Sequence, residues 1–371
     1  MFNETIHCLK MVNTVAWDDI LFLSHPSSIQ HNMPFPRPHL EAFESPLRVQ
    51  MAELYLKERG LLHKMQTQRA PKAPIEMTLS VHSEYLVDSI RIMTDLGSGQ
   101  LGEAAYASPE LLRSALRAVG GAVRAAEAVY EGDAHHAFSL MRPPGHHASV
   151  STAMGLCYFN NIAIAVRTLL AKERVDRVSI IDFDDHHGNG TADTFYADPN
   201  VQYISIHEYD YENYGTGHFS EIGHADAAGT NINIPFFDFS PDASYRSAFE
   251  RIIQPAVQAF EPSIIAVSAG YDPHYADPVG NMDVDSSTFH FIGRVVSSLV
   301  RDVDAMGSFW VLEGGYNPFV IGPSIEASLC GLAGEELPAL QDQVEREINE
   351  LIAESNENIL DNIVEMLSPF W

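Results

Sequence analysis

Cysteine is scarce in this sequence, and the scarcity excludes one class of protein. The 371 residues include 3 cysteines, Cys8, Cys157 and Cys330, and no Cys-x-x-Cys pair occurs. Small extracellular domains that depend on disulfides carry more cysteines at closer spacings. We therefore expect free thiols that are buried or neutral.

Long apolar runs are also missing. The sequence contains no uninterrupted apolar stretch of about 18 residues, the length that a helix needs to cross a bilayer. The first residues, MFNETIHCLKMVNTVAWDD, have neither a basic start nor an apolar core, so they do not resemble a signal peptide. We expect no membrane span and a cytoplasmic protein.

Basic residues are few beside the acidic ones. The chain has 22 Lys and Arg residues against 50 Asp and Glu residues, which gives a formal net charge of -28. Such a chain repels nucleic-acid phosphates and anionic lipids at long range, so we expect no direct nucleic-acid binding. Two interpretations of the acidity stay open: it keeps the protein soluble, or it attracts cationic substrates.

Short apolar runs do alternate with long helical patterns from about residue 110 onward. This alternation predicts an α/β fold with a central, mostly parallel β-sheet flanked by helices on both faces. The expected strands are 136–141, 178–183, 201–207, 264–268 and 309–312, and the expected helices are 108–132, with Ser108 as N-cap and Pro109 at the first helical position, 160–175, 240–260 and 285–303.

The two ends of the chain are expected to differ from this pattern. Residues from about 15 to 46 hold five prolines and show little periodicity, which predicts a long loop that shapes the rim of a site or joins subunits of a homo-oligomer. Residues from about 335 to 368 predict two acidic helices on the outside. We expect residues 1–371 to form a single catalytic domain.

The run IIDFDDHHGNG at 180–190 ends a buried strand in carboxylates and imidazoles. Alternate residues of a strand point the same way, so Asp182, Asp184 and His186 share one side if the strand geometry continues. Ligands bind at the carboxyl ends of parallel strands. Asp184 and His186 supply two ligands of a catalytic metal site, and Asp272, which follows another apolar strand, is the candidate for the third.

A second polar cluster, RPPGHH, directly follows another predicted strand. Its prolines and glycine predict a stiff, sharp loop with His146 and His147 at its tip. One of these histidines is suited to act as a general base. Asp182 and Asn189 are the expected partners that fix the two imidazole tautomers.

A third cluster, EGGYN at 313–317, also follows a predicted strand. Paired glycines let the backbone turn tightly, which leaves the Tyr316 hydroxyl free to donate to a developing oxyanion. With a metal and a histidine base, this set predicts metal-assisted hydrolysis of an amide or ester. Zn²⁺ and Fe²⁺ both suit the ligands. An inactive binding module and a binuclear hydrolase are the alternatives, and the latter needs further Asp and His ligands.

The motifs resemble the zinc-dependent histone deacetylase and acetylpolyamine amidohydrolase family, which has the arginase-like α/β fold. The resemblance covers roughly residues 80–330, through RPPGHHA, GLCYFNNIAIA, DFDDHHGNGT, SAGYDPHYADPVG and LEGGYNP. It implies Zn²⁺ as the cofactor and an acylated amine such as acetyl-lysine as the substrate, and Asn189 and the Glu-Gly-Gly-Tyr form are similar to the class II branch. By this resemblance the metal ligands are Asp184, His186 and Asp272, the tandem histidines are His146 and His147, and the transition-state donor is Tyr316.

The same resemblance implies a structural K⁺ or Na⁺ ion near the zinc, held by side chains or backbone carbonyls. Its ligands would correspond to Asp182, Asp184, His186, Ser205 and Ile206, and a second such site would fall around Phe195, Asp198 and Val201.

Departures from the family pattern concern the substrate. The family holds the acyl-lysine stem between two aromatic rings, and the first of these positions, after Gly155, is Leu156 in this chain. The segment HEYDYENYGTG places Asn213 or Tyr214 at the second. These departures predict a tunnel with less aromatic walling.

An acetylpolyamine or another small N-acyl amine is the alternative substrate. The family often has an Asp before the Ser-Pro helix, where this chain has Glu103 beside Ala104. Polyamine enzymes use acidic rim residues to attract a slender cation, and Glu41, Glu44 and Glu103 are the candidates. Against this alternative, class II polyamine enzymes have a Glu where this chain has Val279.

Overall fold

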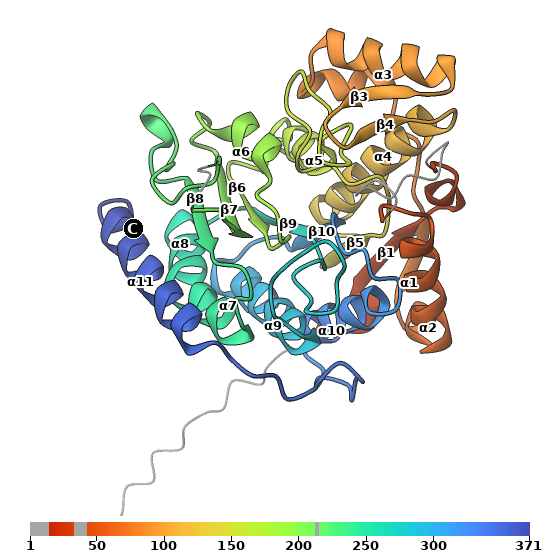
Figure 1. Cartoon of the computed structure of the whole chain (residues 1–371). Coiled ribbons are helices and arrows are strands. Elements are labelled where there is room, and N and C mark those ends of the chain that lie inside the picture. The colour runs from red at the N-terminus through yellow and green to blue at the C-terminus, as the bar shows by residue number, and fades with distance from the viewer. Residues whose placement is uncertain (1–14, 33–42, 212–214) are drawn as a thin grey trace, which may run out of the picture.

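The computed structural model describes residues 15–32, 43–211 and 215–371, and within them an eight-stranded sheet forms the centre of the molecule (Figure 1). All of its neighbouring strands are parallel, which confirms the predicted α/β class. In spatial order the strands are β2 Gln66–Arg69, β1 Ile20–Ser24, β5 His136–Ser139, β10 Ser308–Leu312, β9 Ile264–Ala269, β6 Val178–Asp182, β7 Val201–Glu208 and β8 Asn231–Phe236.

Helices cover both faces of the sheet, as the apolar pattern of the strands requires. In β1, Ile20 and Phe22 join one hydrophobic core, whereas Leu21 and Leu23 join the other. The first core packs against α1 Leu47–Glu58, α2 Leu61–Lys64, α7 Asp242–Ala248, α8 Gln254–Phe260, α9 Ser286–Asp302, α10 Ile321–Ala333 and α11 Glu350–Leu367, and the second against α3 Glu84–Leu96, α4 Leu111–Glu131, α5 Asn161–Leu170 and α6 Asn189–Phe195.

The ends of the chain differ from the sequence prediction. The expected loop at about 15–46 contains β1, which is inserted between β2 and β5, and the short 3₁₀ helices η1 Trp17–Asp19 and η2 Pro26–Ile29. The expected pair of C-terminal helices is one helix, α11, because residues 335–349 form neither helix nor strand.

Two helix boundaries were also predicted wrongly. Helix α4 begins at Leu111 with Glu110 as N-cap, so Ser108 and Pro109 lie before it. The expected helix 160–175 ends early, at Leu170, as α5. The expected helix 240–260 is confirmed as a continuous helical run over residues 242–260, in which a π-helical turn at Phe249–Ile253 joins α7 to α8. No helix in the described part of the chain is long and apolar enough to cross a membrane.

Candidate metal centre

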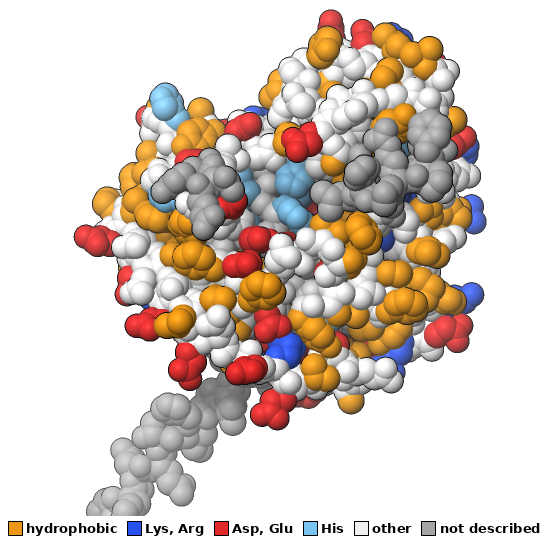
Figure 2. Space-filling model, viewed as in Figure 1, with side chains coloured by type: hydrophobic (Ala, Val, Ile, Leu, Met, Phe, Trp, Pro, Cys, Tyr) orange, Lys and Arg blue, Asp and Glu red, His pale blue; other side chains and the backbone are white. Residues whose placement is uncertain are grey.

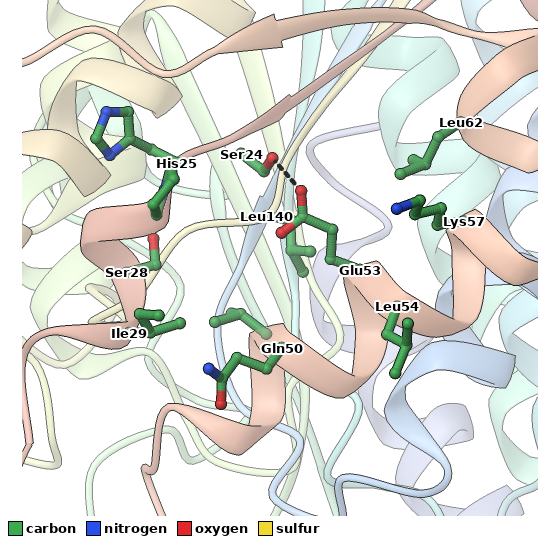
Figure 3. A pocket seen from close by; sticks show the side chains of 12 residues that line it. Ser24, His25, Ser28, Ile29, Gln50, Glu53, Leu54, Lys57, Leu62 and Leu140 are labelled. Carbon is green, nitrogen blue, oxygen red and sulfur yellow. Dashed lines mark hydrogen bonds between the residues drawn. The ribbon is translucent and has the colours of Figure 1, made fainter.

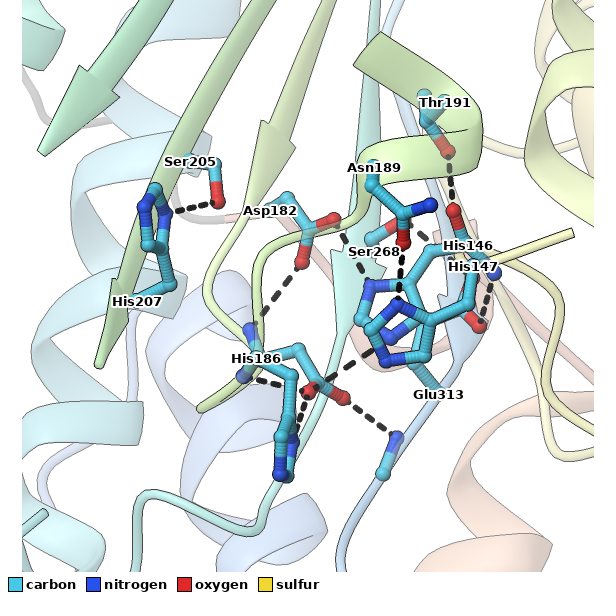
Figure 4. Close-up of polar contacts among 12 residues, drawn as sticks. His146, His147, Asp182, His186, Asn189, Thr191, Ser205, His207, Ser268 and Glu313 are labelled. Carbon is cyan, nitrogen blue, oxygen red and sulfur yellow. Dashed lines mark hydrogen bonds and ion pairs between the residues drawn. The ribbon is translucent and has the colours of Figure 1, made fainter. Parts of the chain in front are cut away.

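Four neighbouring parallel strands in the middle of the sheet, β5, β10, β9 and β6, end at the same edge, which is the one formed by the carboxyl ends of the strands. The loop after each strand brings one of the polar clusters named from the sequence to this edge. His146 and His147 follow β5, Asp272 follows β9, Tyr316 follows β10, and Asp182, Asp184 and His186 end or follow β6. Segments that are far apart in the sequence therefore meet in one cluster (Figure 4).

Asp184, His186 and Asp272 form the core of this cluster. The His186 Nδ1 atom lies 3.2 Å from Asp184 Oδ1 and 3.2 Å from Asp272 Oδ2. One ligand atom from each residue lies within 4.8 Å of the other two, and both carboxylates are buried. A Cβ atom at Gly314 would lie 2.0 Å from Asp272 Oδ2, so the glycine lets the backbone pass close to the ligands. Two carboxylates and one imidazole around a common point fit a catalytic Zn²⁺ or Fe²⁺ ion.

The charges of these three residues support the same fit. Burial raises the pKa of Asp272 to about 7, and the neighbouring Asp184 carboxylate adds to the rise. Burial also opposes the charge on Asp184, but His146 and His186 hold the pKa of Asp184 well below its usual value. Two buried carboxylates whose oxygens lie within 4.8 Å of each other repel each other unless a cation lies between them. A divalent cation would supply that charge.

The two histidines lie beside this centre with their rings 4.1 Å apart. His146 Nδ1 lies 3.1 Å from Asp182 Oδ2, and His147 Nδ1 lies 2.8 Å from Asn189 Oδ1, so each ring has the neighbour named from the sequence. Burial works against a charge on both rings. The carboxylates of Asp184 and Asp182 nevertheless raise the pKa of His146 to about 10, whereas burial and the charge of His146 lower the pKa of His147 to about 3.

Glu313 was quoted in the sequence motif but given no function there. Its buried Oε2 atom accepts hydrogen bonds from the backbone N–H groups of Gly145 at 2.6 Å and His146 at 3.1 Å. Burial raises the pKa of Glu313 to about 7. The Glu313 carboxylate therefore holds the backbone of the loop that carries both histidines (Figure 4).

Tyr316 is held by two residues that the sequence did not single out. Its backbone N–H donates to Asp277 Oδ2 at 2.6 Å, and its ring lies under the Arg48 guanidinium, 4.6 Å from the ring centre. Arg48 comes from α1 and also donates to the carbonyl oxygens of Glu313 and Gly315, each at 2.5 Å. Burial and the Asp272 carboxylate raise the pKa of Tyr316 well above its usual value, so the hydroxyl keeps its proton near neutral pH.

The residues expected to hold a monovalent cation fall into two groups. In the first, Asp182 pairs with Ser205 across β6 and β7, and Ser205 Oγ lies 2.8 Å from His207 Nδ1. In the second, the turn after α6 brings Phe195, Asp198 and Val201 together through the bonds Asp198 N to Phe195 O and Val201 N to Asp198 O. The Arg167 guanidinium donates to the Asp198 carboxylate at 2.5 Å. A cation at either place stays a prediction.

The rim is formed in part by a two-stranded hairpin, β3 Gly99–Gly102 and β4 Ala105–Ala107, that was not predicted. The carbonyl oxygens of Glu103 and Ala104 at its tip accept the N–H groups of Gly155 and Leu156 at 2.9 and 3.0 Å. Gly155 lies against the His147 ring, since an added Cβ would be 2.4 Å from it. The hairpin thus places the backbone of Glu103, whose side chain is exposed, beside the expected tunnel residues.

The other rim predictions have different outcomes. Val279 is partly exposed and donates its N–H to Asp277 Oδ1 at 3.0 Å, on the loop after Asp272. Asn213, Tyr214 and Glu41 lie outside the described residues.

Glu44 was wrongly predicted to be an acidic rim residue. Its side chain is buried and accepts hydrogen bonds from Arg142 Nε at 2.7 Å and Arg48 Nη1 at 3.0 Å. Two guanidinium groups neutralise the carboxylate, so Glu44 cannot attract a cation from solution. It instead ties α1 to the loop that carries the histidines.

The surface view supports the location of the site. In Figure 2, histidine side chains lie in a hollow near the centre of the visible face, with acidic side chains around it. A separate pocket of about 340 Å³ lies between β1, η2 and α1 (Figure 3). Its lining includes Glu53, which accepts a hydrogen bond from Ser24, and Lys57, but none of the clustered carboxylates or paired histidines. This pocket therefore lies apart from the cluster of Asp184, His186 and Asp272.

The comparisons with known proteins concern most of the chain. The family model of the histone deacetylase domain matches residues 42–332. The chain is 34% identical over 314 residues to the histone deacetylase-like amidohydrolase of Pseudomonas aeruginosa, which covers 83% of this chain and 80% of that protein. It is 35% identical over 299 residues to histone deacetylase 6 of Caenorhabditis elegans, covering 76% of this chain and 31% of that longer protein.

The fold agrees with these matches. The crystal structure of the HDA15 HD domain superposes with a TM-score of 0.85 at 27% identity and covers 96% of each chain. The chain therefore belongs to the histone deacetylase family, with its arginase-like α/β fold, and is a hydrolase.

Proposed function

We propose that this protein is a metal-dependent amidohydrolase that removes an acetyl or other acyl group from an N-acylated amine such as acetyl-lysine. The observation that carries the proposal is the convergence of Asp184, His186 and Asp272 beside two histidines and a tyrosine at the sheet edge. These are the groups that amide hydrolysis by an activated water requires. We further propose that residues 1–371 act as one catalytic domain, with a cytoplasmic location.

The cofactor in this proposal is Zn²⁺, or Fe²⁺, held by Asp184, His186 and Asp272. When bound, the ion supplies a Lewis acid that polarises the amide carbonyl and a water molecule. The additional K⁺ or Na⁺ ion near Asp182 and Ser205 would have a structural function.

His147 is the general base in this proposal. Its Nδ1–H donates to the side-chain oxygen Oδ1 of Asn189, which leaves the Nε2 lone pair free to accept a proton. His147 takes a proton from the attacking water as the water oxygen bonds to the carbonyl carbon, and gives this proton to the leaving nitrogen as the C–N bond breaks. The products are a free amine and a carboxylic acid, which then loses its own proton to solvent. His146, which is paired with the Asp182 carboxylate, carries positive charge beside the reacting groups.

Tyr316 donates its hydroxyl proton in a hydrogen bond to the carbonyl oxygen as that oxygen gains negative charge. Because Arg48 and Asp277 hold the ring and the backbone of this residue, the donor is oriented before the substrate arrives. Such orientation lowers the cost of reaching the transition state.

The substrate class follows from the rim. Acidic residues around the hollow and the net charge of -28 favour a substrate that carries positive charge away from the acylated nitrogen, either an acetylpolyamine or an acetyl-lysine peptide with further basic residues. The decisive test is a competition panel of acetyl-lysine peptides, longer acyl-lysines and acetylpolyamines with the purified protein, with release of the free amine as the readout. We expect turnover of at least one of these classes. Absence of turnover across the panel, with the metal supplied, would refute the proposal.

Substitution of Glu103 by alanine is expected to raise KM for acetylpolyamines more than KM for a neutral acetyl-lysine peptide. The reason is that Glu103 carries an exposed carboxylate at the hairpin tip, whose backbone bonds to Gly155 and Leu156, and a second positive charge of a polyamine would pass near this tip. An exposed carboxylate contributes about 1 kcal/mol or less, so a change of up to about fivefold is expected.

Glu173→Ala is the matched control for this measurement. Glu173 is also exposed, but it precedes β6 and so lies at the opposite edge of the sheet. Equal effects of Glu103→Ala on both substrates, or an equal effect of the control, would show that Glu103 does not select polyamines.

A further inference from the structure

One loop connects the two sides of the proposed active site. Residues 270–285 join β9 to α9 and carry Asp272 at their start. Asp277, in the middle of this loop, accepts the backbone N–H groups of Tyr316 at 2.6 Å and Asn317 at 3.0 Å. In return, Asn317 Nδ2 donates to the Ala276 carbonyl oxygen at 2.7 Å. The position of the Tyr316 backbone therefore depends on the position of this loop.

The outer side of the loop is held by the C-terminal segment 335–349, which crosses between α10 and α11 along the lower edge of the view in Figure 1. This segment lies beyond the residues that match the histone deacetylase domain, 42–332. Its Asp342 Oδ2 atom accepts hydrogen bonds from the backbone N–H of Ser286 at 2.9 Å and the Ser286 hydroxyl at 2.5 Å, and it lies 2.9 Å from His274 Nε2. His274 is buried. Asp342 thus ties together the two ends of the loop.

Arg346 makes the second attachment, through carboxylates that would otherwise repel each other. Its Nε atom lies 2.8 Å from Asp283 Oδ1, its Nη1 atom lies 3.2 Å from Asp285 Oδ2, and its Nη2 atom pairs with Asp242. The guanidinium also lies 4.7 Å from the centre of the Tyr275 ring. The Arg346 side chain is 15% exposed, so solvent screens these ion pairs only partly.

We infer that Asp342 and Arg346 are positioning residues for Tyr316, acting through the loop 270–285 and Asp277. The inference rests on the proposed function, in which Tyr316 donates to the oxyanion. Without Arg346, the carboxylates of Asp283 and Asp285 on the loop and of Asp242 on α7 lose their shared cation and repel one another. Without the Asp342 carboxylate, the buried His274 ring and the Ser286 hydroxyl lose a common acceptor. Either change lets the loop move outward and takes the Asp277 carboxylate away from the Tyr316 backbone.

The kinetic test compares Arg346→Ala, Arg346→Lys and Asp342→Asn with wild type. Arg346→Ala is expected to lower kcat by about 10- to 100-fold, the range for a slightly misplaced catalytic group, with little change in KM. Arg346→Lys keeps the charge and is expected to recover part of the loss. The matched control is Arg251→Ala, which also breaks ion pairs to the C-terminal region, with Glu357 and Asp361, but touches no part of the loop.

A double-mutant cycle with Tyr316→Phe distinguishes positioning from a general loss of stability. If Arg346 acts through the Tyr316 hydroxyl, Arg346→Ala has a far smaller effect on kcat when that hydroxyl is already gone. If the two losses multiply, or if Arg346→Ala is no worse than Arg251→Ala, the inference is overturned.

Hydrogen exchange supplies a readout that needs no turnover. The amides of Tyr316 and Asn317 are bonded to Asp277, so Arg346→Ala is expected to speed their exchange while leaving β10 unchanged. Unchanged exchange at these two amides would overturn the inference even if the enzyme is active. Faster exchange together with no turnover by wild type on any acyl amine would instead count against the proposed function alone.

Discussion

Removal of divalent cations by a chelator is expected to abolish hydrolysis of an acetyl-lysine amide, and readdition of Zn²⁺ is expected to restore it. The expectation follows from the buried carboxylates of Asp184 and Asp272, which converge with His186. Three protein ligands would leave the ion free to bind a water and the substrate carbonyl oxygen as well. Without the ion, no remaining group polarises the amide carbonyl strongly enough, since Tyr316 supplies one neutral hydrogen bond.

Asp272→Asn tests the same site by changing one of the ligand residues instead of removing the ion. The change removes one ligand charge at nearly constant volume, so Zn²⁺ affinity and activity are both expected to fall, and added Zn²⁺ is expected to recover activity only in part. Asp304→Asn is the control, because Asp304 is exposed and its backbone φ of 55° suits asparagine.

Thermal unfolding gives a second measurement of metal binding. An ion that binds only the folded protein adds about 2.7 kcal/mol of stability at a concentration of 100 times its Kd. Zn²⁺ should therefore raise the Tm of the metal-free wild type and of Asp304→Asn, and raise that of Asp272→Asn less. Full activity after exhaustive chelation, confirmed by metal analysis, would contradict a metal-dependent mechanism.

The strand-end clusters were predictable from the sequence because their positions follow from one rule. In a parallel sheet, polar residues directly after buried strands gather at one edge, and RPPGHH, IIDFDDHHGNG and EGGYN all follow such strands. The five strands expected from apolar runs, β5, β6, β7, β9 and β10, occur within a residue or two of their predicted bounds. They include the four central strands that carry the site.

The strands that were missed lack this signal. All four residues of β2, QTQR, are exposed at the sheet edge, so they show no apolar alternation. β1 lies in a stretch rich in proline, and β8 contains Pro235, which is permitted because β8 forms the other edge. Their pairing is set by the rest of the sheet and cannot be read from local periodicity.

The supporting residues of the site were missed for a related reason. Arg48 contacts Tyr316 across more than half of the chain, and nothing in the helical pattern of α1 distinguishes this arginine from a solvated one. Glu44 was expected at the rim because polyamine enzymes use acidic rim residues, yet two arginines neutralise it in the interior. Long-range pairing between charged residues leaves no local sequence signal.

Tyr316→Phe is expected to lower kcat by about 10²- to 10³-fold, the usual cost of losing one oxyanion donor. KM should change little, because the hydroxyl bonds most strongly to the oxygen as it becomes charged, and hardly to the ground-state carbonyl. The phenylalanine ring keeps its contact with Arg48, and the backbone bond to Asp277 is unaffected, so the loop itself should not move. The measurement is steady-state kinetics with an acetyl-lysine peptide, together with the Tm of each variant.

Tyr55→Phe is the matched control for loss of a tyrosine hydroxyl. The Tyr55 hydroxyl donates to Glu326 at 2.6 Å on α10, away from the metal centre, so its removal should reduce stability slightly and leave kcat unchanged. A Tyr316→Phe enzyme with wild-type kcat would move the oxyanion role to another donor. A loss in both variants that follows their Tm values would mean that the hydroxyl matters for stability and not for the transition state.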